Sequence, residues 1–292
     1  MTATDRCEAA AGLLWRTTRF DIDCTQPQVM AIVNVTPDSF SDGGQAFGSR
    51  AAIERCEQLL REGAHILDIG GESTRPGAPE VPAAAEWQRV QPVLEAALQL
   101  GVPVSLDTRK AEVMRPALDL GVDIVNDVSA LRDAAAPALL ARYPRAGVCL
   151  MHMRGEPATM QSEARYDDVV AEVREFLAAR LAGARAAGID AERMALDPGY
   201  GFAKTAAQGW QLLARQAGLA TLGRPLVVGL SRKSMLGAAT GRAVDDRLAA
   251  SVAAALLAAE RGAAVLRVHD VAATVDALAV WRQLGPAART GA

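Results

Sequence analysis

Residues 30–44, MAIVNVTPDSFSDGG, carry the pattern that decides the fold. The first four residues are apolar and include β-branched side chains, which predicts a buried strand. The apolar character stops at Asn34, and a polar loop follows, with Pro37 near its start and Gly43-Gly44 at its end. A strand that ends in an amide and opens into a long loop is typical of a functional site, although one such junction also fits an ordinary connection.

Seven more apolar runs repeat this pattern, and each one ends in polar residues. The eight predicted strands are residues 29–35, 65–71, 102–107, 123–128, 147–152, 194–197, 225–230 and 264–268. Segments with helical periodicity lie between them, the clearest at 50–62, 83–100, 109–120, 169–187 and 247–261. Pro116 predicts a kink or an early turn in the third of these segments.

Eight strands alternating with helices predict an α/β protein, a (β/α)8 TIM barrel over residues 28–285. Counting alone leaves a doubly wound open sheet as the alternative. No GxGxxG follows the first strand, which weakens a dinucleotide-binding sheet. Residues 1–27 fit no repeat unit, and we interpret them as an N-terminal extension, a hairpin that closes the barrel floor. Residues 286–292 form a predicted C-terminal tail.

Composition excludes several classes of protein. The 292 residues are 50% hydrophobic, enough for a large core, and the net charge of −3 gives no case for a nucleic-acid partner. No apolar run reaches the ~18 residues of a membrane span, and residues 1–20 lack the apolar block of a signal peptide. The four cysteines are scattered without a Cys-x-x-Cys pair, which argues against a disulfide framework and predicts a cytoplasmic protein with no membrane association.

A barrel brings the C-terminal ends of all its strands to one mouth, and here every one of those ends is polar. The residues at the predicted ends, and in the loops directly after them, are Asn34, Glu72, Thr74, Arg75, Asp107, Asn126, Asp127, His152, Asp197, Ser231, Arg232, Lys233, Arg267 and His269. Asn126 and Asp127 point to opposite sides of a regular strand, so one of them faces away from the mouth. His152 is as consistent with packing as with function, and Asp68 is interpreted as an inward-pointing structural residue.

These residues form two chemical groups. Asp107, Asn126 and Asp197 are short acceptors or amides that suit the nitrogen-rich edge of a flat heterocycle. Lys233, Arg267, His269 and Arg75 are interpreted as cations that suit a diphosphate or a carboxylate. Asn34 offers an amide oxygen to Mg²⁺, which takes few protein ligands when phosphate oxygens supply the others.

Eight motifs together resemble the dihydropteroate synthase family of folate biosynthesis, from about residue 29 to residue 278. They are NVTPDSFSDGG at 34–44, LDIGGESTRPGA at 67–78, SLDTRK at 105–110, VNDVSA at 125–130, CLMHMRGEPATMQ at 149–161, LDPGYGF at 196–202, GLSRKSMLG at 229–237 and RVHDVAATVDAL at 267–278. The resemblance implies a (β/α)8 barrel that condenses 6-hydroxymethyl-7,8-dihydropterin diphosphate with 4-aminobenzoate, using Mg²⁺. It also implies a homodimer formed through the outer helices, and competition by sulfonamides, which are similar to aminobenzoate.

The resemblance implies a role for each matching residue. Asn34 corresponds to the magnesium-linked asparagine, and Asp42 lies in a loop that closes over the site. The implied pterin set is Asp107, Asn126, Asp197 and Lys233, with Arg267 stacking on the ring. The implied diphosphate set is Asn34, Arg267 and His269, completed by Thr74 or Arg75, and the implied aminobenzoate pocket is Thr74, Pro76, Phe202 and Ser234. In the implied chemistry, loss of diphosphate leaves a pterin cation that Asp197 stabilises, and Lys233, Arg267, Asp197 and Asp42 act in catalysis.

Three positions depart from the family pattern. Ala203, Thr205 and Gly209 stand where the family commonly has Gly, Asn and Asn, beside the implied aminobenzoate pocket. A corrinoid-linked pterin methyltransferase and a catalytically silent pterin-binding member are the alternatives. The first is not expected to keep the segment 231–234 or the full loop after residue 34, and the second is expected to lose Lys233, Arg267 or Asp42.

Overall fold

The computed structural model describes residues 13–36, 44–75 and 77–284, with residues 44–47 described by their backbone alone. Eight parallel strands close into a barrel in the order β10-β3-β4-β5-β6-β7-β8-β9. Their bounds are β3 Gln28–Asn34, β4 Ile66–Gly70, β5 Val104–Asp107, β6 Ile124–Asp127, β7 Gly147–Met151, β8 Met194–Asp197, β9 Leu226–Val228 and β10 Ala263–Val268. All eight predicted strands are therefore confirmed, and the open-sheet alternative is excluded.

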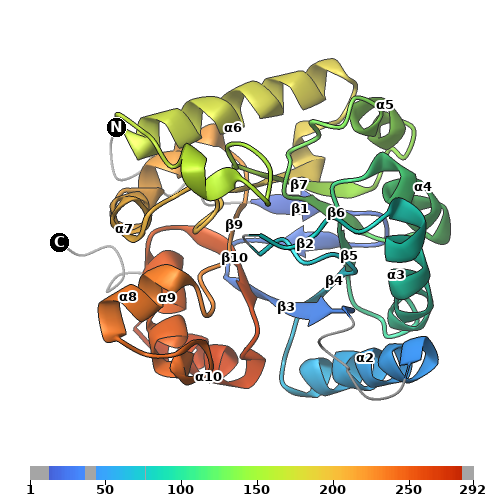
Figure 1. Cartoon of the computed structure of the whole chain (residues 1–292), viewed down its shortest axis with the longest axis horizontal. Helices are drawn as coiled ribbons and strands as arrows, with labels where there is room; N and C mark the ends of the chain where they lie inside the picture. The colour runs from blue at the N-terminus through green and yellow to red at the C-terminus, as the bar shows by residue number, and fades with distance from the viewer. Residues whose placement is uncertain (1–12, 37–43, 76, 285–292) are drawn as a thin grey trace.

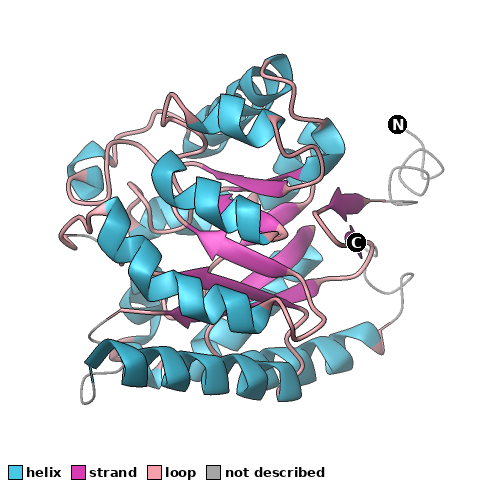
Figure 2. Cartoon of the chain, turned by 90° about the vertical axis from the view of Figure 1, so that its right-hand side faces the viewer, coloured by secondary structure: helices cyan, strands magenta, loops and turns pink. Residues whose placement is uncertain are grey.

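Helices surround this barrel on the outside, as Figures 1 and 2 show. Their bounds are α2 Gly44–Arg61, α3 Ala83–Ala97, α4 Ala111–Leu120, α5 Ala136–Ala141, α6 Val169–Ala186, α7 Ala206–Ala214, α8 Ser234–Thr240, α9 Leu248–Glu260 and α10 Val271–Arg282. Among the described helices, none combines the length and the apolar character that crossing a bilayer requires.

The helix α4 does not end at Pro116, so the predicted early turn is wrong. The helix continues to Leu120, where Gly121 closes it in a left-handed conformation at φ 92°. Its apolar face is fully buried, with Val113 and Met114 both at 0% exposure. Pro116 has no backbone N–H and so removes one hydrogen bond from the helix. Burying the apolar face stabilises the helix by more than this lost hydrogen bond destabilises it.

Side-chain alternation along the strands builds two separate cores. In β3, Val29, Ala31 and Val33 pack outward in one cluster with the surrounding helices. Met30 faces inward and belongs to a second cluster at the barrel floor, and Asn34 ends the strand at the mouth. The period of two therefore places the polar tip and the apolar floor inside the same barrel.

The floor is closed by an antiparallel hairpin of β1, Leu14–Arg16, and β2, Asp21–Asp23. Trp15 is 0% exposed and packs in the floor cluster with Ile22 and the inward residues of the barrel strands. Its indole Nε1 donates to the carbonyl oxygen of Arg193 at 2.9 Å. The predicted hairpin is thus present, while the boundaries of the extension and of the tail stay a prediction, since residues 1–12 and 285–292 lie outside the described part.

Candidate active site

Strand register places polar side chains in one layer at the mouth of the barrel. Asn34 pairs with Gly70, Gly70 with Asp107, and Asp107 with Asn126. A side chain at Gly70 would place its Cβ 3.2 Å from the Cβ of Asp107, so the missing side chain leaves room beside that carboxylate. The layer therefore combines an amide, a carboxylate and a second amide around an opening.

Arg267 joins this layer to a carboxylate one step deeper. Its Nε donates to Asp68 Oδ2 at 2.6 Å and its Nη2 donates to Asp107 Oδ2 at 2.7 Å. Asn126 Nδ2 donates to the same Asp68 oxygen at 3.1 Å. Four of the barrel strands thus contribute to one hydrogen-bonded cluster, which brings Asp107, Asn126 and Arg267 together as predicted.

Asp68 was interpreted as a structural residue, and the structure places it within the site cluster instead. Its side chain is 0% exposed, and its Oδ1 has no hydrogen-bond partner among the described residues. A buried carboxylate oxygen without a partner is costly, so it is suited to receive a donor from a ligand or from water. The signal in the sequence was an acid inside an otherwise apolar strand, facing the same side as Gly70.

Burial and charge act against each other in this cluster. Burial raises the pKa of Asp107 to about 7, although Arg267 opposes the shift. Burial acts to lower the pKa of Arg267, but Asp68 and Asp107 together outweigh it and hold that pKa above its ordinary value, so the guanidinium stays charged. The site thus holds a permanent cation next to a carboxyl that titrates near neutrality.

Asp197, Lys233 and Phe202 form the second part of the mouth. Asp197 accepts from the backbone N–H of Gly199 at 2.7 Å, while burial raises its pKa. Burial lowers the pKa of Lys233 to about 8, with the charge of Asp197 opposing. The Lys233 ammonium lies 4.2 Å from the ring centroid of Phe202, within range of a cation–π interaction. Lys233 therefore contacts an aromatic face and is influenced by the charge of a buried carboxylate, while its predicted pterin-binding role stays a prediction.

His269 follows β10 and was interpreted as a cation, but the structure corrects its charge. Burial and the neighbouring guanidinium of Arg267 lower its pKa to about 4, so the ring is neutral at pH 7. Its Nδ1 lies 3.0 Å from Ser231 Oγ, which leaves Nε2 for a ligand. A neutral imidazole binds an anion by donating a hydrogen bond and adds no charge of its own.

Comparison with known proteins agrees with this geometry. The model of the family described as pterin binding enzyme matches residues 30–269. The chain is 52% identical over 276 residues to the dihydropteroate synthase of Neisseria meningitidis serogroup C, covering 93% of this chain and 98% of that protein.

The chain belongs to the dihydropteroate synthases of the pterin binding enzyme family. It is therefore an enzyme, a transferase of folate biosynthesis. Among solved structures, dihydropteroate synthase of Xanthomonas albilineans with 4-aminobenzoic acid is similar at TM-score 0.86 and 51% identity, covering 91% of this chain and 96% of that one. The Burkholderia cenocepacia dihydropteroate synthase complexed with 7,8-dihydropteroate is similar at TM-score 0.86 and 47% identity, and the match covers 95% of this chain and 98% of that one.

The loop at residues 72–81, within the family motif LDIGGESTRPGA and its continuation, is held by buried charges. Lys110 Nζ donates to Glu72 Oε2 at 2.6 Å, to Glu86 Oε2 at 2.7 Å and to the carbonyl of Val81 at 2.7 Å. Glu72 Oε1 accepts from the backbone N–H of Val81 at 3.1 Å, which closes the loop on itself. This support fixes the base of the segment that carries Thr74 and Arg75.

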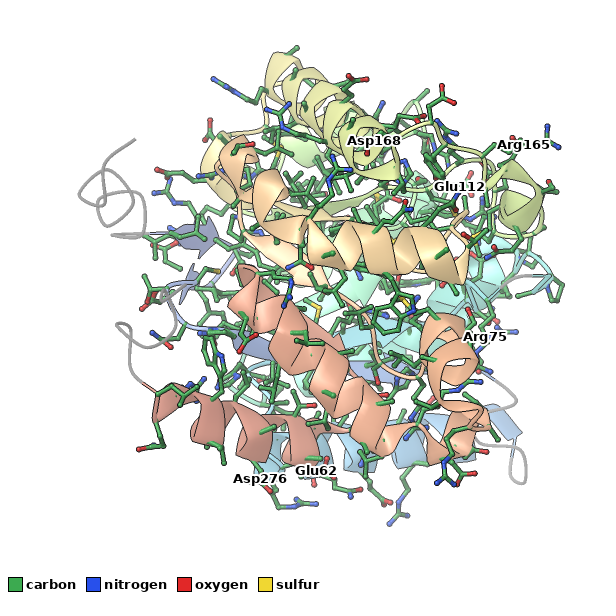
Figure 3. All side chains as sticks on the ribbon, turned by 90° about the vertical axis from the view of Figure 1, so that its left-hand side faces the viewer. Glu62, Arg75, Glu112, Arg165, Asp168 and Asp276 are labelled. Atoms are coloured by element: carbon green, nitrogen blue, oxygen red, sulfur yellow. The ribbon has the colours of Figure 1, made fainter. Side chains whose placement is uncertain are left out.

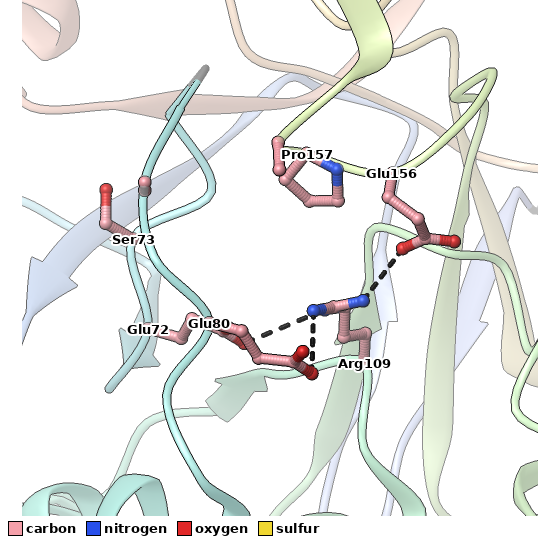
Figure 4. Close-up of a pocket in the computed structure, with 8 residues that line it drawn as sticks. Glu72, Ser73, Glu80, Arg109, Glu156 and Pro157 are labelled. Atoms are coloured by element: carbon pink, nitrogen blue, oxygen red, sulfur yellow. Dashed lines mark hydrogen bonds and ion pairs between the residues drawn. The ribbon is translucent and has the colours of Figure 1, made fainter.

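Arg109 ties the same loop to the loop after β7. It donates to Glu80 Oε1 at 3.0 Å and to Glu156 Oε2 at 2.8 Å, across a pocket that Glu72 also lines (Figure 4). The two glutamates are 68% and 54% exposed, so each ion pair is weak by itself. The arrangement links two loops at the rim of the mouth.

The predicted aminobenzoate residues are less closely joined than the pterin residues. Arg75 is exposed, and Figure 3 shows it at the edge of the molecule. Thr74 is half-buried, and Ser234 is an exposed first residue of α8. Pro76 and Asp42 lie outside the described residues, so their predicted roles stay predictions.

Sequence reasoning assigned no role to Lys204, which the structure places under the site. Lys204 is only 3% exposed, and its Nζ lies 2.8 Å from His152 Nδ1. The same Nζ donates to the carbonyls of Gly199 at 2.9 Å and Phe202 at 3.0 Å. Lys204 thus fastens the turn that carries Phe202, and His152 is a packed partner in that support. In the sequence Lys204 stands as a single lysine between the changed positions 203 and 205, and its partners are a histidine and two carbonyl groups that only the fold brings to it.

The departures from the family pattern have local structural explanations. Thr205 caps α7, and it forms a reciprocal capping box with Gln208. Gly209 faces α8, where an added Cβ would meet Met235 Sδ at 2.8 Å. Ala203 is buried and adopts φ 49° at the start of this segment. Thr205 and Gly209 thus set the start of α7 and its packing against α8.

The donor chemistry at Asn34 fits Mg²⁺ only together with a ligand. Within the described residues, no group of three or more His, Cys, Asp or Glu side chains is placed to hold a metal ion. Asn34 is half-buried at the tip of β3, so it can offer one amide oxygen at the mouth. Mg²⁺ keeps several waters and binds phosphate oxygens readily, so one protein oxygen is compatible with a shared site.

Proposed function

We propose that this chain condenses 6-hydroxymethyl-7,8-dihydropterin diphosphate with 4-aminobenzoate, giving 7,8-dihydropteroate and diphosphate. The observation that carries the proposal is the arginine cluster, in which Arg267 spans two carboxylates beside Asn126 at one barrel mouth. Such a cluster offers acceptors to an aminopyrimidine edge and a cation to a charged tail. Family membership supplies the identity of both substrates.

The pterin is assigned to the deep half of the mouth. Asp107, Asn126 and Asp197 present oxygen acceptors to the N–H groups of the ring. Asp68 Oδ1, which has no partner in the part of the chain that the structure describes, offers one more. Arg267 lies flat against the ring in the same proposal, because its guanidinium is held in place by two carboxylates. The two ion pairs orient the guanidinium plane before the pterin binds, so the ligand does not spend binding energy on ordering this side chain.

The diphosphate is assigned to the shallower half, with His269, Arg267 and Asn34, and with Thr74 or Arg75 closing over it. Asn34 would hold Mg²⁺ together with the diphosphate, and the ion would neutralise part of the negative charge of the leaving group. His269 donates one N–H to an oxygen of the diphosphate, and Arg267 supplies a permanent positive charge.

Substitution takes place at the pterin methylene carbon. The C–O bond to diphosphate breaks, and its electron pair leaves with the diphosphate. The resulting cation is delocalised into the pterin, where the buried carboxylate of Asp197 stabilises it. The amine nitrogen of aminobenzoate attacks the carbon, and its surplus proton leaves to diphosphate or solvent. No covalent enzyme intermediate forms, and the loop bearing Asp42 excludes the water that would otherwise capture the cation.

Aminobenzoate is assigned to the space above Phe202, with Lys233, Ser234 and Thr74 as its contacts, and the part predicted for Pro76 concerns a residue outside the described ones. The contact of the Lys233 ammonium with the Phe202 ring supports this assignment, because it places an aromatic face next to a cation. Sulfonamides share the ring and the anionic end of aminobenzoate, so they are expected to compete for the same space.

We also propose a cytoplasmic homodimer. The described cysteines Cys24, Cys56 and Cys149 are free and buried, as expected in a reducing compartment. Two apolar side chains are exposed just before α9 and at its start, Val244 at 46% and Leu248 at 47%, and exposed apolar side chains suit a partner subunit.

The assay mixes purified protein with the pterin diphosphate, aminobenzoate and Mg²⁺ and measures released diphosphate. Release that depends on aminobenzoate supports the synthase. Binding of the pterin without turnover favours the silent member. Omitting Mg²⁺ tests the metal assignment, which predicts a large loss of turnover.

A further inference from the structure

We propose that Ser231 is a positioning residue, which holds neutral His269 with its proton on Nε2 so that this N–H donates to the diphosphate. The inference deepens the proposed function and rests on it for the identity of the anion. The protonation form itself belongs to the free protein and is measured without turnover.

The two residues meet because their strands are neighbours in the barrel. The strands β9 and β10 are parallel, with Val228 paired to Leu266. Ser231 lies three residues beyond Val228, and His269 three residues beyond Leu266. Ser231 Oγ lies 3.0 Å from His269 Nδ1, and the backbone N–H of His269 donates to the same Oγ at 3.3 Å.

The count of protons selects one form of the ring. Ser231 is 7% exposed, and its hydroxyl carries one proton. If Nδ1 accepts that proton, the hydroxyl oxygen still accepts from the backbone N–H, and all three groups are satisfied. If Nδ1 carried a proton, the serine hydroxyl would need another acceptor, and none is found among the described residues. A buried donor without an acceptor is costly, so the Nε2–H form is favoured.

Burial and the surrounding charges keep this ring neutral. Arg267, Arg232 and Lys233 are positive and near, and together with burial they outweigh the opposing carboxylate of Asp270. Arg232 is itself paired with Asp270, at 2.6 Å from Nη2 to Oδ1, which reduces what that carboxylate offers to His269. The imidazole therefore has one proton, and Ser231 decides which nitrogen carries it.

A fixed neutral donor suits the departure of diphosphate. The oxygen that accepts from Nε2–H gains negative charge as the C–O bond breaks, so this hydrogen bond strengthens in the transition state. The ring need not rotate or exchange its proton during the reaction, because Ser231 fixes the ring orientation and the position of the proton before the substrate binds. The positive charge is left to Arg267, whose guanidinium does not titrate.

The direct test is ¹⁵N NMR of protein labelled at histidine. The chain contains three histidines, at 65, 152 and 269, so the signals are few. For His269 at pH 7 we expect a neutral ring with Nε2 protonated and Nδ1 bare. The Ser231→Ala variant should shift both nitrogens toward a mixture of the two forms, and Ser231→Thr should restore the wild-type pattern, since it keeps the hydroxyl.

Kinetics provide the second readout. We expect Ser231→Ala to lower kcat/KM for the pterin diphosphate about 10-fold, with the KM for aminobenzoate unchanged, and Ser231→Thr to recover most of the loss. The matched control is Ser129→Ala, a serine 6% exposed that contacts Asp127 and has no contact with His269. A fold check by circular dichroism and thermal unfolding accompanies each variant.

Two results would overturn the proposal. One is a wild-type His269 that is an imidazolium or carries its proton on Nδ1 at pH 7. The other is a folded Ser231→Ala variant with the same ¹⁵N shifts and kcat/KM as wild type. If wild-type protein shows the expected ring form but no aminobenzoate-dependent diphosphate release, the proposed function fails while the positioning of His269 stands.

Discussion

Replacing Arg267 by alanine tests the central cluster most directly, because one side chain links two buried carboxylates. The guanidinium is 2.6 Å from Asp68 and 2.7 Å from Asp107, whose side chains are 0% and 10% exposed. Removing one partner of a buried ion pair costs about 3–5 kcal/mol, since a charge is left without compensation. We expect the Arg267→Ala variant to lose about this much free energy of unfolding at pH 8 and still to fold, as domains have about 5–15 kcal/mol in total.

The loss of unfolding free energy in the Arg267→Ala variant should depend on pH, and the titration of Asp107 determines its direction. Burial already raises the pKa of Asp107 from 3.8 to about 7, and removing the nearby cation raises it further. The folded variant then holds a proton that the unfolded chain releases, so its stability falls as the pH rises from about 4 through the folded pKa. The deficit against wild type is therefore larger at pH 8 than at pH 5.5.

Urea unfolding at the two pH values measures the stability change, and steady-state kinetics measure the catalytic one. We expect kcat to fall at least about 10²-fold, about 2.7 kcal/mol or more. The matched control is Arg16→Ala, which removes an exposed ion pair of 2.8 Å with Glu192 and should cost about 0–1 kcal/mol. A variant at Arg267 that is as stable as the Arg16 control at pH 8, or that keeps kcat within about threefold of wild type, would refute the reasoning.

Four further changes test other parts of the molecule. Lys233→Ala should lower kcat at least about 10²-fold with little change in thermal stability, and near-normal turnover would remove this residue from the mechanism. Lys204→Met should raise the KM for aminobenzoate about 10-fold by releasing the turn above it, whereas an unchanged KM would limit this lysine to a packing role. Gly199→Ala should lower the free energy of unfolding in urea by more than about 2 kcal/mol, because the added Cβ would lie 2.0 Å from the backbone oxygen of His152. The control Gly101→Ala also has a positive φ, 74°, but its Cβ would meet no described atom within 4 Å, so it should lower the free energy of unfolding by only about 1 kcal/mol. Equal losses in the two variants would contradict the predicted clash at Gly199. Trp15→Ala should cost about 3–5 kcal/mol without changing the KM values, and an intact melting temperature would show that the hairpin does not support the floor.

The sequence alone determined where the strands lie and what stands at their tips. A run such as residues 30–33 is apolar because both faces of a barrel strand are buried, and that composition is visible without coordinates. Asn34 and Asp107 end such runs abruptly, so their place at the mouth followed from the rule that parallel strands in a barrel share one direction. The eight motifs then supplied the substrates, which residue chemistry had limited to a flat heterocycle and an anion.

Only the tertiary structure decided how these residues are charged and supported. Asp68 and Arg267 are 199 residues apart, and their contact at 2.6 Å turned a residue interpreted as structural into part of the site. His269 is neutral because burial and Arg267 act on it, and Lys204 acts through carbonyl groups of a turn. Protonation and pairing depend on desolvation and on partners that the fold brings together, and neither is encoded in the spacing of residues along the chain.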